Sequence, residues 1–157
     1  MNIDEKFMSE AIKLALKCKN GKDVPVGCVI VKNNKIIGRG YNKRNKKNNA
    51  LLHAEMIAIE KACKKVHDWM LVDTTMYVTL EPCVMCTGAI IESRIPRVVY
   101  GAKSNRTGCL GSILDLSNNE KLNSKIEISS GICEEECSNL IKDFFKNLRE
   151  ENIKEEK

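Results

Sequence analysis

Several features that would place this 157-residue chain in other protein classes are missing from its sequence. No apolar run approaches the roughly 20 residues that a membrane-spanning helix needs. Residues 1–5 are polar and acidic and lack the basic-then-apolar form of a secretory signal, so we expect a cytoplasmic protein with no membrane partner. Neither a G-x-G-x-x-G nor a Walker sequence is present, which leaves no motif for a nucleotide cofactor.

Linkers, repeats and low-complexity segments are also absent, so the sequence predicts a single domain over residues 1–157, with 152–157 as a frayed charged tail. Apolar periodicity predicts helices at 4–20, 53–66, 83–94 and 133–151, and strands at 24–31, 35–41, 75–80, 97–101 and 125–129. The first two strands form a hairpin, and the later strands alternate with helices. This order predicts an α/β fold with three layers, α/β/α, around a mixed sheet of about five strands.

Cysteine, by contrast, is abundant, with eight residues. Without a secretory signal, metal ligands and buried thiols are favoured over disulfides. Cys133 and Cys137 are four residues apart on a predicted helix, where they could pair with another thiol or bind a second metal, although no His lies near them in sequence.

The candidate chemistry lies in two short segments, H-A-E at residues 53–55 and E-P-C-V-M-C at residues 81–86. One imidazole and two thiolates are zinc ligands, and a site with three protein ligands keeps one position for water, as catalytic zinc sites do. Positions i and i+2 point to nearly opposite sides of a helix, so His53 and Glu55 converge on one ion only if it lies beyond the helix start. Pro82 suits a first helical position, and Cys83 and Cys86 share one helix face. We therefore predict zinc bound by His53, Cys83 and Cys86 between two helix N-termini.

Glu55 is the one carboxylate placed to act as a base beside this metal. Two thiolates formally neutralise Zn²⁺, so the ion acidifies its water less than it would among neutral imidazoles, and a nearby base is needed. The same carboxylate can carry a proton to a ring nitrogen and then to a leaving amine. This arrangement favours hydrolytic deamination.

Each motif taken alone has a plainer interpretation. A single C-x-x-C can be a redox pair or half of a four-ligand structural zinc site, and a single His is more often a core or surface residue. The two motifs in this order, with Pro before the first Cys, favour the catalytic zinc site.

Positive charge is concentrated ahead of the first motif. Residues 1–50 hold 12 Lys and Arg against 4 Asp and Glu, whereas residues 51–157 hold 14 against 17. Four of these charges lie in one short loop, at Lys43, Arg44, Lys46 and Lys47. The loop is either a solvated surface segment or a rim that contacts phosphate groups.

These residues resemble one family, the bacterial tRNA-specific adenosine deaminases within the cytidine-deaminase-like superfamily. The resemblance extends over about residues 4–149 and includes D-V-P-V-G at 23–27, G-Y-N at 40–42, Y-V-T-L-E-P-C-V-M-C at 77–86, S-R-I at 93–95, V-Y-G-A at 99–102 and D-F-F at 143–145. It implies a homodimer with one Zn²⁺ per subunit that converts the wobble adenosine of a tRNA anticodon stem-loop to inosine. A zinc-bound hydroxide would attack C6 of adenine, with Glu55 as the proton shuttle.

The resemblance also implies substrate contacts. Asn42 would hydrogen-bond the flipped adenine near Val26. Further RNA contacts would come from the loop after residue 102 and from the last helix, at Ser104, Asn105, Arg106, Phe144, Phe145 and Arg149.

Two other functions remain open at this point. The same zinc chemistry serves deaminases of a free base, nucleoside or nucleotide of the cytosine, guanine or deoxycytidylate type. The chain could also be a non-catalytic zinc module that binds RNA, although such a module has no use for Glu55. The basic loop favours RNA as the substrate.

Overall fold

The computed structural model describes residues 1–18 and 21–157, and it contains a five-stranded sheet with helices on both faces. Its strands are β1 (Gly27–Lys32), β2 (Lys35–Tyr41), β3 (Thr74–Leu80), β4 (Arg97–Ala102) and β7 (Glu127–Ser130). Its helices are α1 (Ile3–Ala15), the short η1 (Leu16–Cys18), α2 (Ala54–Val66), α3 (Val84–Glu92) and α4 (Glu134–Glu155). A small appendage holds β5 (Asn118–Asn119), η2 (Glu120–Leu122) and β6 (Ser124–Lys125).

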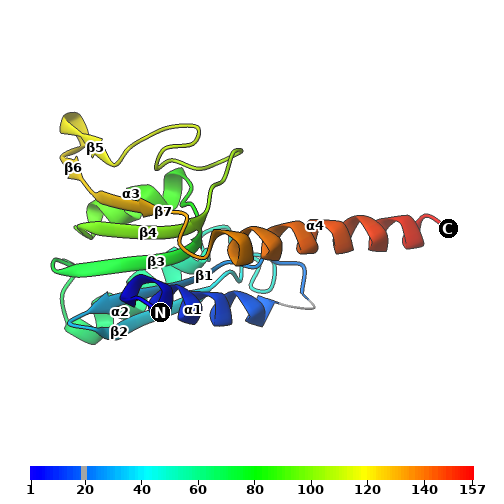
Figure 1. The fold of residues 1–157 in the computed structure, drawn as a ribbon, viewed down its shortest axis with the longest axis horizontal. Helices are drawn as coiled ribbons and strands as arrows, with labels where there is room; N and C mark the ends of the chain where they lie inside the picture. Colours follow the sequence, from blue (N-terminus) through cyan, green and yellow to red (C-terminus); the bar gives the residue numbers. More distant parts are fainter. Residues whose placement is uncertain (19–20) are drawn as a thin grey trace.

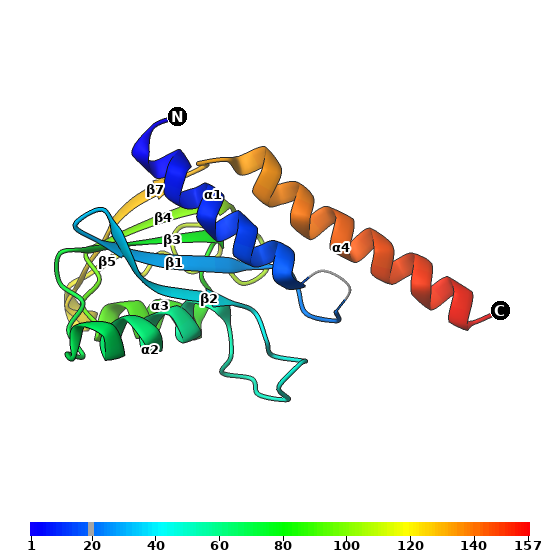
Figure 2. The ribbon, with the colours of Figure 1, turned by 90° about the horizontal axis from the view of Figure 1, so that it is seen from below.

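The sheet is mixed, with strand order β2-β1-β3-β4-β7. β1 runs antiparallel to both β2 and β3, whereas β3, β4 and β7 are parallel. α1 and α4 cover one face, and α2 and α3 cover the other (Figures 1 and 2). The structure confirms the predicted three-layer α/β/α fold.

Alternation along β1 separates the two cores. Cys28 and Ile30 are fully buried against α2 and α3, while Val29 and Val31 pack with Phe7 of α1. A strand buried on both faces explains why this part of the sequence is an apolar run rather than a polar and apolar alternation.

Two glycines in β2 bring α2 directly onto the sheet. A Cβ at Gly38 would lie 2.3 Å from the Ala58 carbonyl oxygen, and one at Gly40 would lie 2.3 Å from that of Ala54. Any side chain at these positions would push the helix away. The close packing fixes the start of α2 beside the end of β2, where His53 stands.

One end of the sheet collects the segments of interest. Four strands, β2, β3, β4 and β7, run in one direction. Their last residues therefore lie at the same end of the sheet: Tyr41, Leu80, Ala102 and Ser130. In parallel α/β sheets ligands bind beyond the carboxyl ends of the strands. The second half of α4 extends past the sheet at this end (Figure 1).

Several element boundaries differ from the sequence-based prediction, among them those of α3, which ends at Glu92 rather than 94, and of β7, which begins at Glu127 rather than 125. The first α-helix ends at Ala15 and continues as a 3₁₀ turn to Cys18; the remainder of its predicted range lies outside the described residues. β1 begins at Gly27 rather than at residue 24, because Pro25 has no N–H to donate to a strand ladder. α4 remains helical to Glu155, where the sequence predicted a frayed tail, because Glu, Lys and Arg are good helix formers.

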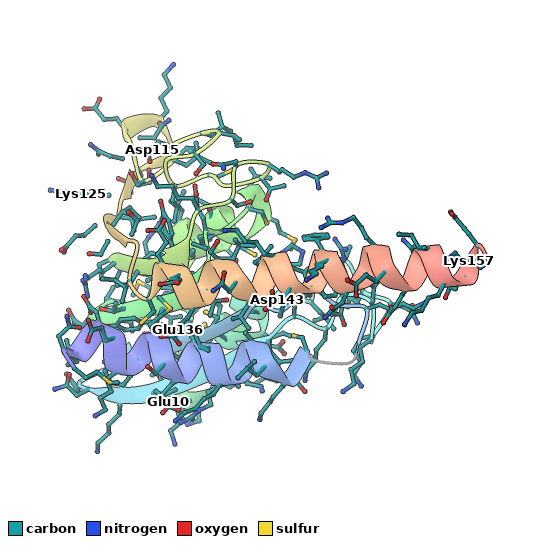
Figure 3. All side chains as sticks on the ribbon, turned by 45° about the vertical axis from the view of Figure 1, so that its right-hand side comes forward. Glu10, Asp115, Lys125, Glu136, Asp143 and Lys157 are labelled. Carbon is teal, nitrogen blue, oxygen red and sulfur yellow. The ribbon has the colours of Figure 1, made fainter. Side chains whose placement is uncertain are left out.

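α4 lies beside α1, and the labels at Glu136 and Asp143, with Lys157 at the chain end beyond it, trace its course past the end of α1 (Figure 3). No helix among the described residues is both long enough and apolar enough to span a bilayer.

Candidate metal and catalytic site

The two ligand segments are built alike, each at the N-terminus of a helix. His53 is the N-cap of α2 and Cys83 is the N-cap of α3, both with extended backbone, and neither side chain caps its own helix. A typical N-cap is Ser, Thr, Asp or Asn, whose oxygen bonds the first free N–H groups. Here the cap positions carry metal-binding atoms instead, and Cys86 follows one turn later in α3.

Pro82 was predicted at the first helical position, but it lies two positions before it. The helix starts at Val84, so Pro82 precedes the N-cap and is not the first helical residue. The reason is the extended conformation of Cys83, which sets its thiol at the helix end.

The ligand atoms of His53, Cys83 and Cys86 lie within 4.8 Å of one another. His53 Nδ1 is 3.6 Å from the Cys83 Sγ and 3.5 Å from the Cys86 Sγ. A tetrahedral zinc with ordinary Zn–S and Zn–N bonds separates sulfur from nitrogen by about 3.6 Å. The three atoms therefore stand where one zinc ion would hold them, with a fourth position left for water.

The ionisation of the two thiols is unequal. A hydrogen bond from Cys86 lowers the pKa of Cys83 to about 4, while the same bond and burial raise the pKa of Cys86 far above its usual value. The pKa of His53 is raised, mainly by its hydrogen bond with Cys83. The partial positive charge of a helix N-terminus stabilises the thiolate of Cys83. A thiolate is the form of cysteine that binds a metal cation.

Glu55 lies in the same pocket, in the first turn of α2, and is only 4% exposed. The pKa of its carboxyl is raised to about 6, mainly by burial and also by the charge of Cys83, against the lowering effects of its backbone hydrogen bond and of His53. A carboxylate with a pKa near neutrality can both accept and release a proton. We name His53, Glu55, Cys83 and Cys86 the metal pocket.

Asn42 and Val26 meet at the end of the sheet. The backbone N–H of Asn42 donates to the Val26 carbonyl at 3.1 Å, and both residues are nearly buried. The Asn42 side chain donates to the Val24 carbonyl and accepts from the Arg44 N–H, each at 3.1 Å. One further donor and one further acceptor of that amide are left for a ligand. Its contact with adenine stays a prediction.

The basic loop over residues 43–49 is held by a buried carboxylate that the sequence did not single out. Asp23 is 6% exposed and accepts the N–H groups of Asn45 at 2.6 Å and Lys46 at 3.0 Å. The Asn45 side chain donates to the Lys22 carbonyl at 2.7 Å. These contacts give the loop a fixed shape, and all four of its positive charges lie on its surface.

A second loop, 104–112, is held in a comparable way by Glu81. Its backbone also joins the ligand segment, because the Cys109 N–H donates to the Pro82 carbonyl at 3.0 Å. This loop, which includes Ser104, Asn105 and Arg106, is therefore attached to the segment that provides Cys83 and Cys86. We name the loops 43–49 and 104–112 the rim loops.

The remaining predicted contacts lie on α4. Phe144 is half-buried and Phe145 is exposed, and their rings meet edge to face with centroids 5.2 Å apart. Phe144 lines a groove of about 450 Å³ between α4 and the end of α1, with Leu140 and Leu148. Arg149 is fully on the surface. The structure does not bring these three residues into the metal pocket.

Cys133 and Cys137 form no second metal site. Within residues 1–18 and 21–157, His53, Cys83 and Cys86 are the only cluster of three or more potential ligands. Both thiols are free, and Cys137 is buried against Gly101 of β4. Cys137 is thus a packing residue of the core.

Residues 1–102 match the family described as the cytidine and deoxycytidylate deaminase zinc-binding region. A tRNA-specific adenosine deaminase from Streptococcus pyogenes serotype M1 is 45% identical over 144 residues, which cover 92% of this chain and 84% of that relative. The chain belongs to this deaminase family. Its motifs, identified above from the sequence, are thus confirmed as those of the tRNA-specific adenosine deaminases.

Solved structures agree with this family. A structure described in a study of A-to-I editing by tRNA:A34 deaminases matches with a TM-score of 0.82 and 32% identity, over 86% of this chain and 98% of that one. A guanine deaminase from Bacillus subtilis matches with a TM-score of 0.60 and 41% identity, over 66% of each chain. The family's zinc-binding region together with the three ligand atoms establishes one Zn²⁺ per chain.

Proposed function

We propose that this chain is a zinc-dependent hydrolase that converts the wobble adenosine of a tRNA anticodon loop to inosine. The observation that carries the proposal is the Glu55 carboxylate, buried in the same pocket as a complete set of three zinc ligands. A structural zinc site uses four protein ligands and has no role for an unliganded acid. The names of the relatives support adenosine in tRNA as the substrate.

His53, Cys83 and Cys86 hold the zinc, which when bound acts as a Lewis acid and lowers the pKa of a water molecule. Glu55 accepts a proton from that water and delivers one to N1 of adenine. As the oxygen bonds to C6, Glu55 takes the second proton from that oxygen and passes it to the exocyclic nitrogen, whose bond to C6 then breaks. Water and adenosine are consumed, and inosine and ammonia are produced.

The surroundings of the pocket support RNA as the substrate. An anticodon loop offers an unpaired base that can be turned outward at low unstacking cost, and such loops are where proteins read RNA sequence. Asn42 would hydrogen-bond the base, beside Val26, and its neighbour Lys43 bonds the carbonyl of Leu52, the residue before His53. Lys43, Arg44 and Lys46 in the first rim loop provide charge for phosphates.

Further contacts to the anticodon stem-loop would come from the second rim loop and from α4, at Ser104, Asn105, Arg106, Phe144, Phe145 and Arg149. The location of these residues supports the proposed contacts. The loop after β4 and the protruding half of α4 both lie at the end of the sheet that holds the metal pocket (Figure 1).

We further propose a homodimer in the cytoplasm. Large apolar side chains that are at least half exposed lie close in sequence to the ligands and to the second rim loop: Leu51 before His53, Val84 after Cys83, and Ile113 and Leu114 after residue 112. Exposed apolar surface of this kind marks an interface. Light scattering should give twice the chain mass, and Val84→Glu should lower it toward one chain.

One specific observation favours a second candidate. The 41% identity with a guanine deaminase shows that this sequence pattern also accompanies a free base as substrate. The basic rim loop has no obvious use for a neutral free base, whereas it suits a polyanion.

The experiment that separates the two uses zinc-loaded protein and a panel of substrates. The panel contains an anticodon stem-loop with adenosine at the wobble position, free adenosine, cytidine, deoxycytidylate and guanine, with Glu55→Gln as the blank. We expect inosine in the stem-loop and no turnover of the free compounds. Turnover of guanine alone would assign the chain to the second candidate, and silence everywhere with zinc bound would indicate a binding module.

A further inference from the structure

Glu81 is a buried carboxylate outside the chemistry described so far. It is 2% exposed, and its two oxygens accept hydrogen bonds from the backbone N–H groups of Ser104, Leu110 and Ser112, at 3.2, 3.0 and 3.1 Å. The Ser112 hydroxyl donates to it as well. An ionised carboxylate has about four lone-pair positions. All of its partners come from one rim loop.

Glu81 also joins that loop to the metal-binding segment. Its own N–H donates to the Ala102 carbonyl at 2.9 Å, so it lies at the end of β3 beside β4. Only Pro82 separates it from the ligand Cys83, and the Pro82 carbonyl accepts from Cys109 at 3.0 Å. Backbone and side-chain contacts therefore fasten the loop to the segment that provides two of the three zinc ligands.

Gly108 shows that the loop is shaped around this carboxylate. A Cβ at this position would lie 2.3 Å from the Glu81 carboxyl carbon and 2.4 and 2.6 Å from its two oxygens. Those oxygens are held by four donors and have little room to move. Glycine is therefore needed here for close approach to the acid.

We propose that Glu81 is a positioning residue that holds loop 104–112 against the metal-binding segment, and so fixes where residues 104–106 meet the substrate. The structural half of the inference stands on the contacts alone, and the half concerning RNA rests on the function proposed above. Removing the acceptor leaves three backbone N–H groups without partners, and the loop must open to let water reach them.

The test is Glu81→Gln, which keeps the size of the side chain but replaces one acceptor oxygen by an N–H₂ donor facing other donors. We expect one zinc per chain and faster hydrogen exchange at the amides of Ser104, Leu110 and Ser112. For an anticodon stem-loop we expect KM to rise about tenfold, with kcat changed by less than about threefold.

Asp4→Asn is the control, because Asp4 is also a hydrogen-bonded carboxylate that is largely buried, but it pairs with Arg97 at the opposite end of the sheet. It should lower stability while leaving the three exchange rates and KM unchanged. If Asp4→Asn raises KM equally, the effect of Glu81→Gln is general destabilisation and the inference is wrong.

Other outcomes are equally decisive. Unchanged exchange at the three amides of Glu81→Gln would overturn the holding role. Faster exchange with an unaltered KM would overturn the link to RNA. If the wild-type protein does not deaminate the stem-loop, the proposed function fails. Hydrogen exchange in Glu81→Gln would then still test whether Glu81 holds the loop. Should Glu81→Gln not fold, Gly108→Ala, which displaces the carboxylate without removing it, is judged by the same criteria.

Discussion

The metal pocket and the rim loops are built by different means. The pocket draws its ligands from the starts of α2 and α3, within a few residues of well-packed helices. The rim loops have no regular structure and take their shape from buried acids elsewhere in the chain, Asp23 for residues 43–49 and Glu81 for residues 104–112. The metal ligands are thus placed on rigid elements, whereas the contacts proposed for the substrate lie partly on loops that a few hydrogen bonds hold.

This difference predicts two separable phenotypes. Variants in the pocket should lose metal or turnover, and variants in the rim loops should weaken RNA binding while zinc and turnover at saturation persist.

The largest effect is expected for Cys86→Ala. Loss of one of three ligands should cost more than the roughly 10- to 100-fold in metal affinity that follows loss of a residue behind a ligand. Zinc content by mass spectrometry should fall well below one per chain, and deamination should become undetectable. Full zinc content in this variant would contradict the assignment of the ligands.

Glu55→Gln should come next. The amide cannot carry a proton, so kcat should fall by roughly 10²- to 10⁴-fold. Zinc content and the affinity for the stem-loop should stay close to those of the wild type, as measured by fluorescence anisotropy. Substantial remaining turnover would refute the role of Glu55 as the proton shuttle.

The rim should respond to loss of charge. In the double variant Lys46→Gln and Lys47→Gln, Kd for the stem-loop should rise, and its dependence on salt should weaken by about 0.7 in log–log slope per lost phosphate contact. Lys64→Gln with Lys65→Gln removes the same charge from the far end of α2 and should leave both quantities unchanged. An equal effect of the two pairs would mean that net charge alone attracts the RNA.

The smallest effect on function is expected at Asp4, although it contributes to stability. Its carboxylate bonds Arg97 at 2.8 Å, and that hydrogen bond lowers the pKa of Asp4. Since the folded-state pKa lies below the unfolded one, the pair stabilises the fold above about pH 4, and this contribution disappears as pH falls through the folded-state pKa. Asp4→Asn should reduce the free energy of unfolding by about 1–3 kcal/mol at pH 7 and by much less near pH 2. Urea unfolding at both pH values tests this, and an equal loss at the two would contradict it.

The sequence predicted the pocket because its residues are close in sequence to helix starts and their chemistry is distinctive. The cluster of His53, Cys83 and Cys86 could be predicted from residue type and spacing, and the layered fold followed from the periodicity of strands and helices. The element boundaries were less predictable, as at Pro82, because the conformation of Cys83 depends on its place in the site.

The supports of the rim could not be predicted in the same way. Asp23 and the loop it holds are about 22 positions apart, and Glu81 meets residues 23 to 31 positions ahead. No periodicity marks such contacts. The one signal available was Glu81, an acid at a strand end directly before P-C-x-x-C. A carboxylate buried at such a place needs hydrogen-bond donors from elsewhere in the chain.

The most direct test of this separation is single-turnover deamination of the anticodon stem-loop over a range of enzyme concentrations, with the wild type and the Lys46→Gln, Lys47→Gln variant compared at equal zinc content. If the pocket carries the chemistry and the rim loops only bind RNA, the half-saturating enzyme concentration should rise in the variant. Its rate constant at saturation should stay within about twofold of that of the wild type. A lower rate constant at saturation with an unchanged half-saturating concentration would contradict it, because the rim loop would then take part in the chemistry.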